Sequence, residues 1–325
     1  MRALLCTKLG PASDLVVAEV DDPVPGPGEV VVDVDAAGLN FPDTLIIEGK
    51  YQFKPDLPFT PGGEAAGTVS AVGDGVARVE VGDRVIALHT FGAFAERWKV
   101  PATSVAPIPP GLDSIQAAAF GLTYGTSYHA LKDRVKLQPG ETLLVLGAAG
   151  GVGSAAVELG KAMSATVIAA ASTPEKLAWA IDLGADITID YSQVDLRDAV
   201  KESTGGRGVD VVYDPVGGDF TEAALRSTAW NGRLAVVGFA AGDIPSIPLN
   251  LTLLKGVAIV GVFWGRSMTE EPALHRENFA ELAAMIGDGR IRPRVSAEFA
   301  LDDYEAAFAL FTDRKVMGKA VFRLR

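Results

Sequence analysis

Cysteine, histidine and excess positive charge are all scarce in this chain of 325 residues. The one cysteine, Cys6, excludes an intramolecular disulfide and suits a reducing compartment, so we expect a cytoplasmic protein. The three histidines, His89, His129 and His275, lack the spacing of a zinc site. A formal charge of −12 leaves no basic patch for nucleic acid or an anionic membrane. No run reaches the roughly 18 apolar residues of a membrane span, and the N-terminus lacks a signal-peptide pattern.

An apolar run that breaks into glycines is the most informative segment. Residues 142–146 read as a buried strand, residues 147–153 are Gly-Ala-Ala-Gly-Gly-Val-Gly, and residues 154–162 continue as a helix. Such a turn directs the N–H groups of a helix N-terminus at a pyrophosphate. Ala148 takes the first glycine position of G-x-G-x-x-G, so the match is a variant, and an ordinary steric turn is the alternative. The flanking strand and helix favour a dinucleotide held by Ala149, Gly150, Gly151 and Val152.

The end of the next strand, residues 166–171, indicates which dinucleotide binds. NAD-selective folds place Asp or Glu there to bind the adenosine ribose, whereas this chain has Ser172. A hydroxyl and a nearby cation suit a 2′-phosphate, so the sequence predicts NADPH with Ser172, Lys176 and Tyr191 at the phosphate. Glu175 agrees with this only if its side chain points away. A solvated helix lysine is the ordinary alternative for Lys176.

The chain changes character near residue 122. Before that point, short β-type runs alternate with Gly and Pro turns, which predicts an all-β domain. Strands then alternate with helices, which is typical of a doubly wound parallel sheet. We therefore expect an α/β protein with a first domain over 1–122, completed by 265–325, and a second domain over 123–264, with a cleft between the two.

Four blocks carry a resemblance that spans nearly the whole chain: residues 36–43 (AAGLNFPD), residues 57–67 (LPFTPGGEAAG), residues 81–85 (VGDRV) and the glycine-rich turn. Together they resemble the medium-chain dehydrogenase/reductase superfamily and, within it, the zinc-free NADPH:quinone oxidoreductases, the zeta-crystallin-like family. The resemblance implies a GroES-like β-barrel catalytic domain plus a Rossmann domain. It also implies a homodimer that pairs edge strands of the Rossmann sheets, for which 259–263 is the candidate.

Zinc ligands are missing from the positions where this superfamily's alcohol dehydrogenases carry them. The catalytic Cys and His of those enzymes correspond to Asn40 and Gly63 here. Zinc requires thiolate, imidazole or carboxylate ligands, and without a Lewis acid the oxidation of a simple alcohol loses its main electrostatic aid. We therefore expect no metal, and hydride transfer to a quinone, which accepts hydride without a metal.

The resemblance also assigns site residues. It places Asn40 beside the nicotinamide, where its amide would orient the carboxamide or an acceptor oxygen, and Thr123 near the nicotinamide ribose. It also places Gly238, Phe239, Val262 and Phe263 in two loops that close over the cofactor. Candidate walls of the substrate pocket are Phe41, Leu45, Phe53, Phe91 and Trp264, although aromatic residues at such places are equally often core.

Two alternative functions stay open. Leu45 stands where quinone reductases often have a tyrosine that contacts the cofactor, whereas Tyr51 lies near the proton-donating tyrosine of enoyl-thioester reductases. A protonated phenol can donate to a developing enolate, so Tyr51 is a candidate catalytic residue or else part of the pocket wall. Reduction of an enoyl thioester or another activated enone is thus the second candidate. A non-catalytic, crystallin-like NADPH-binding protein is the third.

Overall fold

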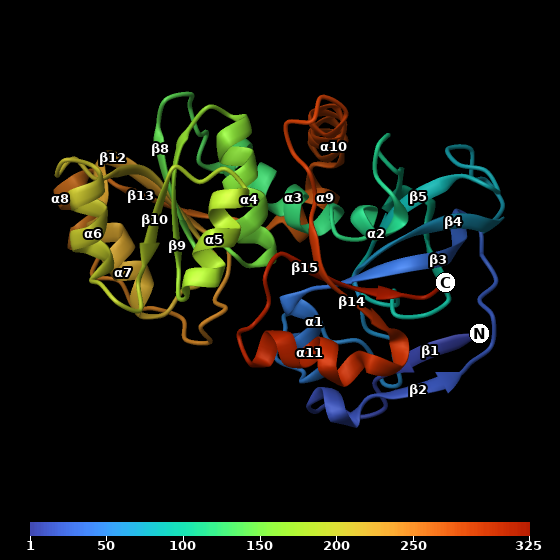
Figure 1. The fold of residues 1–325 in the computed structure, drawn as a ribbon. Helices are drawn as coiled ribbons and strands as arrows, with labels where there is room; N and C mark the ends of the chain where they lie inside the picture. The colour runs from blue at the N-terminus through green and yellow to red at the C-terminus, as the bar shows by residue number, and fades with distance from the viewer. The chain divides into compact units, whose positions relative to one another are not determined.

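The computed structural model describes all 325 residues and divides into two compact units (Figure 1). The first unit comprises residues 1–122 and 293–325, and the second comprises residues 123–292. The sequence boundary at 122 matches this division, whereas the return to the first unit at 265 was predicted too early. Residues 265–292 belong to the second unit. Helix α10 (Pro272–Gly287) lies in this segment.

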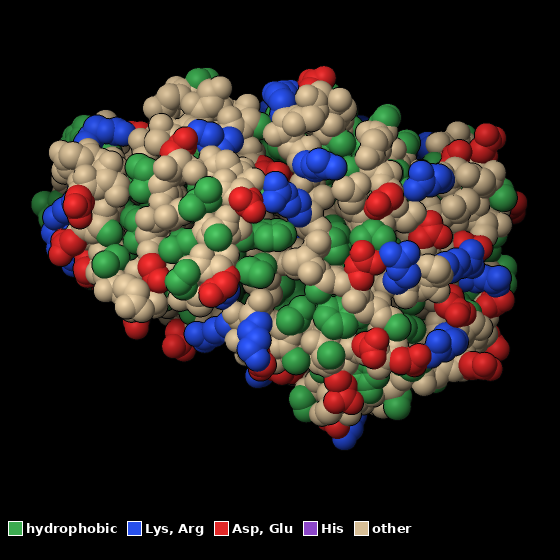
Figure 2. Space-filling view, viewed as in Figure 1, with side chains coloured by type: hydrophobic (Ala, Val, Ile, Leu, Met, Phe, Trp, Pro, Cys, Tyr) green, Lys and Arg blue, Asp and Glu red, His purple; other side chains and the backbone are tan.

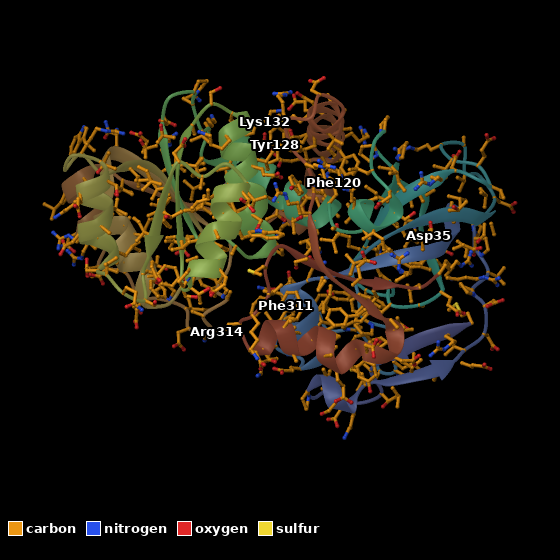
Figure 3. All side chains as sticks on the ribbon, viewed as in Figure 1. Asp35, Phe120, Tyr128, Lys132, Phe311 and Arg314 are labelled. Atoms are coloured by element: carbon orange, nitrogen blue, oxygen red, sulfur yellow. The ribbon has the colours of Figure 1, made fainter.

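Contacts of α10 explain that correction. Tyr128 and Lys132, labelled side by side in Figure 3, both donate hydrogen bonds to Glu281 of α10, each at 2.6 Å. Both residues precede the Rossmann sheet in the chain. The partners are about 150 residues apart in sequence, so local patterns gave no sign of the link.

The first unit is an antiparallel sheet built on one long central strand. β3 (Glu29–Leu39) carries Val30, Val32 and Val34 on one buried face and pairs with three other strands, β4, β6 and β15. The sheet runs in the order β14-β15-β3-β4-β5-β7, with β6 also paired to β3. Beside β3 its strands are β4 (Glu64–Val72), β5 (Arg84–Leu88), β6 (Arg97–Pro101), β7 (Val105–Pro107), β14 (Val295–Ala300) and β15 (Lys319–Arg323), and a separate pair is β1 (Arg2–Leu5) with β2 (Val16–Glu19).

The C-terminal segment is fastened to this unit by aromatic packing. Phe94 contacts Phe322 of β15 and Phe308 of α11, with ring centroids 4.9 and 6.3 Å apart. All three side chains are buried to at least 99%, so they anchor the returning chain in one apolar core. The helices of the unit are α1 (Phe41–Ile47), α2 (Ser114–Ala117) and α11 (Tyr304–Thr312), with short 3₁₀ turns η1 (Ala12–Asp14), η2 (Ala102–Ser104) and η4 (Leu301–Asp303).

The second unit is a six-stranded parallel sheet in the order β10-β9-β8-β11-β12-β13. The order reverses on either side of β8, which is the topology of a doubly wound fold and confirms the predicted class. Its strands are β8 (Thr142–Leu146), β9 (Thr166–Ala171), β10 (Ile187–Asp190), β11 (Val209–Asp214), β12 (Thr228–Val236) and β13 (Ala258–Gly261).

Helices cover both faces of this sheet (Figure 1). Leu144 and Leu146 point to the face that packs on α6 and α7, while Leu143 points to the opposite face, where it meets α4 at Gly160. This alternation explains why β8 is apolar along its length, since it is buried on both faces. The helices are α3 (Gly121–Tyr128), the π-helical η3 (His129–Arg134), α4 (Gly151–Ala162), α5 (Pro174–Asp182), α6 (Leu196–Ser203), α7 (Asp219–Arg226), α8 (Asn250–Lys255), α9 (Trp264–Glu270) and α10.

The surface agrees with the acidic composition. On the face drawn in Figure 2, Lys and Arg side chains are interspersed with Asp and Glu and form no continuous patch. No helix has both the length and the apolar character needed to cross a membrane.

Candidate functional site

The glycine-rich turn joins β8 to α4 as the sequence predicted. Gly147 makes the tight turn, and its φ of +58° lies in the left-handed region. Ala148, at the first glycine position of the fingerprint, is therefore not the residue that makes the turn. Gly150 is the N-cap of α4 and its N–H donates to the Gly147 carbonyl at 2.9 Å. At Gly153 a Cβ would lie 2.2 Å from the same carbonyl, so a side chain is excluded there. The residues therefore fit a dinucleotide, because the first N–H groups of α4 are left for a ligand.

Two buried hydroxyl groups, of Ser127 and Tyr213, form a hydrogen-bonded chain that ends on this turn. Ser127 of α3 donates to the Val152 carbonyl at 2.9 Å and lies 2.8 Å from the Tyr213 hydroxyl. Burial raises the pKa of Tyr213 above its usual range. Neither residue was singled out in the sequence, because their importance comes from a contact between residues 86 apart.

The loop after β9 gathers the residues predicted to bind a 2′-phosphate. Tyr191 donates its backbone N–H to Ala171, the last residue of β9, at 3.1 Å, which brings it beside Ser172. Its ring packs on Phe220 with centroids 4.5 Å apart. Ser172, Lys176 and Tyr191 are all half-buried.

The side chain of Glu175 stays in the same loop as Ser172 and Lys176. Its carboxylate accepts hydrogen bonds from its own backbone N–H and from the Thr173 hydroxyl, and these lower its pKa. The side chain is exposed but stays at the first turn of α5. A carboxylate and a lysine therefore share the loop, and they have opposite effects on a phosphate.

The loops after β12 and β13 hold the next candidates. Gly238 donates to the Asp214 carbonyl at 3.3 Å, and Phe239 lies over Gly217, where a Cβ would come within 2.8 Å of its ring. Val262 donates to the Val236 carbonyl at 3.0 Å, while Phe263 is 56% exposed. An apolar cavity of about 170 Å³ lies behind this region, lined by Phe239, Val236, Leu234, Ile244, Ile247 and Ile259 among others.

Two further candidates in this unit are buried. Thr123 is 2% exposed on α3. Trp264 is 7% exposed, packs where a Cβ on Gly125 would stand, and lies 5.6 Å from the His275 ring. The Trp264 indole thus contributes to the packing of the second unit.

Asn40 lies in a buried polar cluster of the first unit. Lys319 donates to Asn40 Oδ1 at 2.5 Å and to Glu64 Oε2 at 2.8 Å. Asn40 Nδ2 donates to the Gly38 carbonyl at 3.1 Å and to Glu64 Oε2 at 3.2 Å. The exposed fraction of Asn40, Glu64 and Lys319 is at most 4%. The sequence predicted Asn40 but not this cluster.

Asp43 and Tyr51 lie close to the same cluster. The Asp43 carboxylate accepts from the Asn40 backbone N–H at 2.8 Å, at the first turn of α1. Burial raises the pKa of Asp43 to about 7, although that hydrogen bond and Lys319 favour its charged form. Burial, with a smaller effect of Asp43, also raises the pKa of the Tyr51 phenol. The phenol is therefore protonated at neutral pH.

The predicted pocket walls of this unit fall into two groups. Phe53 stacks on Phe91 with centroids 5.7 Å apart, and Phe53 is 40% exposed. Phe91 also meets the buried Phe59 edge-on at 6.1 Å, so this aromatic stack continues from the core to the surface. Phe41 and Leu45 are half-buried on α1, the helix that follows Asn40.

The position of Gly63 leaves little room for a side chain. A Cβ there would lie 2.9 Å from the His89 carbonyl oxygen. No three His, Cys, Asp or Glu side chains are grouped so as to hold a metal ion.

Comparison with known families matches both units. Residues 26–110 match the alcohol dehydrogenase GroES-like domain, and residues 151–280 match a family described as zinc-binding dehydrogenase. These matches agree with the predicted pairing of a GroES-like domain with a Rossmann domain.

The similarity to individual known proteins extends over nearly the whole chain. A quinone oxidoreductase-like protein 2 of Mus musculus is 41% identical over 325 residues, covering 100% of this chain and 92% of that protein. A quinone oxidoreductase of Pseudomonas aeruginosa is 38% identical over 298 residues, or 91% of each chain. The crystal structure of Escherichia coli quinone oxidoreductase complexed with NADPH has a TM-score of 0.93 at 31% identity and covers 99% of this chain and 100% of its own.

Proposed function

Because this chain belongs to the quinone oxidoreductase family of the medium-chain dehydrogenase/reductase superfamily, we propose that it is a zinc-independent NADPH:quinone oxidoreductase. The family makes it an oxidoreductase with a nicotinamide cofactor. The observation that carries the zinc-independent part is the pair of Asn40 and Gly63. At the expected ligand positions stand an amide, whose two Nδ2 hydrogens and one Oδ1 lone pair bind protein groups, and a glycine with no room for a side chain.

The glycine turn holds the cofactor in this proposal. Gly150, Gly151 and Val152 present the N-terminus of α4 to the pyrophosphate, and Asn40 binds the nicotinamide carboxamide. Bound NADPH supplies the hydride that a quinone accepts without a metal. The protein orients the rings and excludes water, and the partly exposed stack of Phe53 on Phe91 provides an aromatic wall for a planar acceptor.

The preference for NADPH is supported by Ser172 and Lys176 and opposed by Glu175. Replacing Lys176 by Ala should weaken NADPH about 10- to 150-fold more than NADH, since a charge-assisted phosphate contact contributes about 1.5 to 3 kcal/mol. Glu175→Gln, at the residue just before Lys176, is the matched variant. It should increase the preference for NADPH over NADH. Dissociation constants of both cofactors, from calorimetric titration, measure this. Equal weakening of NADPH and NADH by the lysine change would remove Lys176 from the phosphate site.

Reduction of an activated enone is the second candidate, and Tyr51 is the residue that favours it. Burial keeps its phenol protonated, which is the state that a proton donor to an enolate requires. Tyr51→Phe should leave quinone reduction largely intact and slow enone reduction by about 10²- to 10⁴-fold. Unchanged rates on every enone would assign Tyr51 to the pocket wall.

A homodimer through the Rossmann edge belongs to the same proposal. β13 is the last strand of its sheet, with Ile259 41% exposed, and an edge strand offers unpaired N–H and C=O groups to a second copy. Light scattering on the purified protein tests this, and a monomer at micromolar concentration would contradict it.

The deciding experiment is oxidation of NADPH and NADH by 1,4-benzoquinone, 9,10-phenanthrenequinone and crotonyl-CoA, with chelator present. Quinone turnover that prefers NADPH supports the proposal. Turnover of crotonyl-CoA alone would favour the enone reductase. Tight NADPH binding without turnover of any acceptor would favour a non-catalytic NADPH-binding protein.

A further inference from the structure

Three strand ends of the first unit meet at Asn40. Asn40 follows the end of β3, Glu64 begins β4, and Lys319 begins β15. Both β4 and β15 run antiparallel to β3, so their first residues lie at the end where β3 finishes. Gly38 makes room for the Glu64 and Lys319 side chains, because a Cβ there would lie 2.9 Å from Glu64 Oε2 and 3.0 Å from Lys319 Nζ.

The donors and acceptors around Asn40 permit one orientation of its amide. An ammonium group only donates hydrogen bonds and a backbone carbonyl only accepts them. The atom 2.5 Å from Lys319 Nζ is therefore Oδ1, and the atom 3.1 Å from the Gly38 carbonyl is Nδ2. If the amide were rotated by half a turn, Nδ2 would face the Lys319 ammonium, so that a donor faced a donor. Oδ1 would face the Gly38 carbonyl, so that an acceptor faced an acceptor.

That orientation limits what Asn40 can offer to a ligand. Both hydrogens of Nδ2 are used, one by the Gly38 carbonyl and one by Glu64. Oδ1 has two lone pairs, and Lys319 takes one. The remaining lone pair is the only polar capacity that the side chain retains, so Asn40 has no hydrogen left for an acceptor oxygen.

We propose that Glu64 and Lys319 are positioning residues that hold the Asn40 amide so that it can only accept a hydrogen bond, from an N–H group of the nicotinamide carboxamide. This inference rests on the proposed role of Asn40 beside the nicotinamide. It narrows that role, because an acceptor fixes the rotation of the carboxamide and excludes donation to a quinone oxygen. Lys319 acts through Asn40, and Glu64 acts by holding both Lys319 and Nδ2.

A double-mutant cycle separates positioning from mere stabilisation. Asn40→Ala and Lys319→Met are measured singly and together, and the readout is the dissociation constant of NADPH from calorimetric titration. One neutral hydrogen bond corresponds to about 2- to 13-fold in affinity, so each single variant should weaken NADPH within that range. In the Asn40→Ala background, Lys319→Met should have no further effect. Equal weakening in both backgrounds, or no weakening by Asn40→Ala, would overturn the proposal.

A cofactor analogue tests the direction of the hydrogen bond. The reduced 3-acetylpyridine analogue of NADPH replaces the carboxamide NH₂ by a methyl group and keeps the carbonyl oxygen. If Asn40 is an acceptor, Asn40→Ala should not weaken this analogue. An equal loss with NADPH and with the analogue would mean that Asn40 donates to the carbonyl, and the inference would be wrong.

Two controls complete the design. If Lys319→Met does not fold, Glu64→Gln with Lys319→Met replaces it in the cycle, because this pair leaves no unpaired buried charge. Arg233→Met serves as the matched control in the second unit, since Arg233 pairs with Glu141 away from the glycine turn. Because the readout is binding, the cycle remains informative if no quinone is reduced. The loss of the proposed function and the loss of this inference are therefore distinguishable.

Discussion

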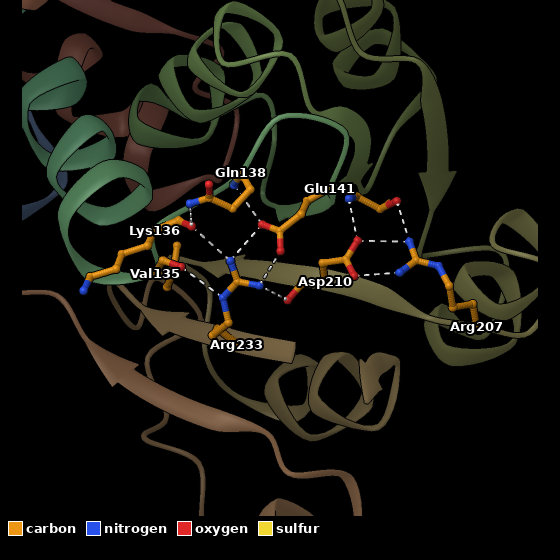
Figure 4. Close-up of polar contacts among 8 residues, drawn as sticks. Val135, Lys136, Gln138, Glu141, Arg207, Asp210 and Arg233 are labelled. Carbon is orange, nitrogen blue, oxygen red and sulfur yellow. Dashed lines mark hydrogen bonds and ion pairs between the residues drawn. The ribbon is translucent and has the colours of Figure 1, made fainter. Parts of the chain in front are cut away.

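Two polar networks, one chosen from each unit, differ in the exposure of their charged side chains. In the second unit, Arg233 donates to both carboxylate oxygens of Glu141 at 2.7 and 2.8 Å, and Arg207 donates to Asp210 at 2.6 Å (Figure 4). We call these four residues the outer network, since Arg233 and Glu141 are 21% and 22% exposed and Arg207 is 53% exposed. Asp210 also accepts from the backbone of Thr142 at 2.8 Å.

The inner network is the cluster of Asn40, Asp43, Glu64 and Lys319 in the first unit. The side chains of its ion pair, Lys319 and Glu64, are 5% and 0% exposed. It also contains a carboxyl group, Asp43, whose pKa burial raises to about 7.

We interpret the outer network as one that stabilises the sheet and the inner network as one that orients Asn40. The outer network ties Thr142 and Asp210, near the starts of β8 and β11, to Arg233 of β12, which pairs with Val211. These residues lie at the opposite end of the sheet from the glycine turn. Removing charges from water there costs little, because solvent still reaches them. The inner network removes an ion pair from water almost completely, which rarely adds stability. A network of that kind is better explained by the orientation that it imposes on Asn40.

The largest expected effect is on stability in the inner network. Lys319→Met leaves Glu64 buried without its cation, and we expect a loss of about 3 to 5 kcal/mol in the free energy of unfolding. Adding Glu64→Gln to the same protein should recover much of that loss, because the unpaired charge is removed. Urea denaturation of the three proteins measures both steps. A double variant no more stable than the single one would show that packing, rather than charge, holds this site.

The outer network should respond less. Arg233→Met removes the two hydrogen bonds to Glu141 and the weaker ones to the carbonyls of Val135, Lys136 and Asp210. Glu141 stays partly hydrated, so we expect a loss of about 1 to 2 kcal/mol. The affinity for NADPH should not change. The same urea series and cofactor titration apply here. A loss as large as that of Lys319→Met, or a weaker cofactor, would erase the contrast between the two networks.

Local patterns account for what the sequence predicted well. The glycine turn, the strands of both sheets and the loop of Ser172 are contiguous in the chain, and their residue types have few alternative conformations. Asp43 and Glu64 lay within the blocks that carried the resemblance, but residue type alone does not reveal burial. Lys319 gave no signal, because its contact with Asn40 joins residues 279 apart. The predicted domain boundary at 265 was wrong for the same reason, because Glu281 accepts a hydrogen bond from Tyr128, which lies 153 residues away in sequence.

The last expected effect is a dependence of stability on pH between 6 and 8. It belongs to the inner network, because the pKa values of Glu141 and Asp210 in the outer network are lowered and both groups titrate at more acidic pH. The pKa of Asp43 is about 7 in the folded protein, whereas an aspartate in water has an ordinary pKa of 3.8. Between these two pH values the folded state holds a proton that the unfolded state has lost. Stability therefore falls as pH rises through this window. Lys319 and the Asn40 backbone N–H oppose the rise in pKa, and burial together with Glu64 causes it.

Asp43→Asn removes the titration and keeps an acceptor for the Asn40 backbone N–H. From pH 6 to pH 8, the wild-type protein should lose about 1.4 kcal/mol relative to the variant, which is the free energy of one pKa unit. The difference between the two proteins isolates Asp43, because His89 and His275, whose pKa values burial lowers, titrate in both. Denaturant unfolding at pH 6, 7 and 8 measures it. Curves that stay parallel would mean that Lys319 keeps Asp43 ionised from pH 6 to pH 8, so that the charges of the inner network, like those of the outer one, would stay constant over this range.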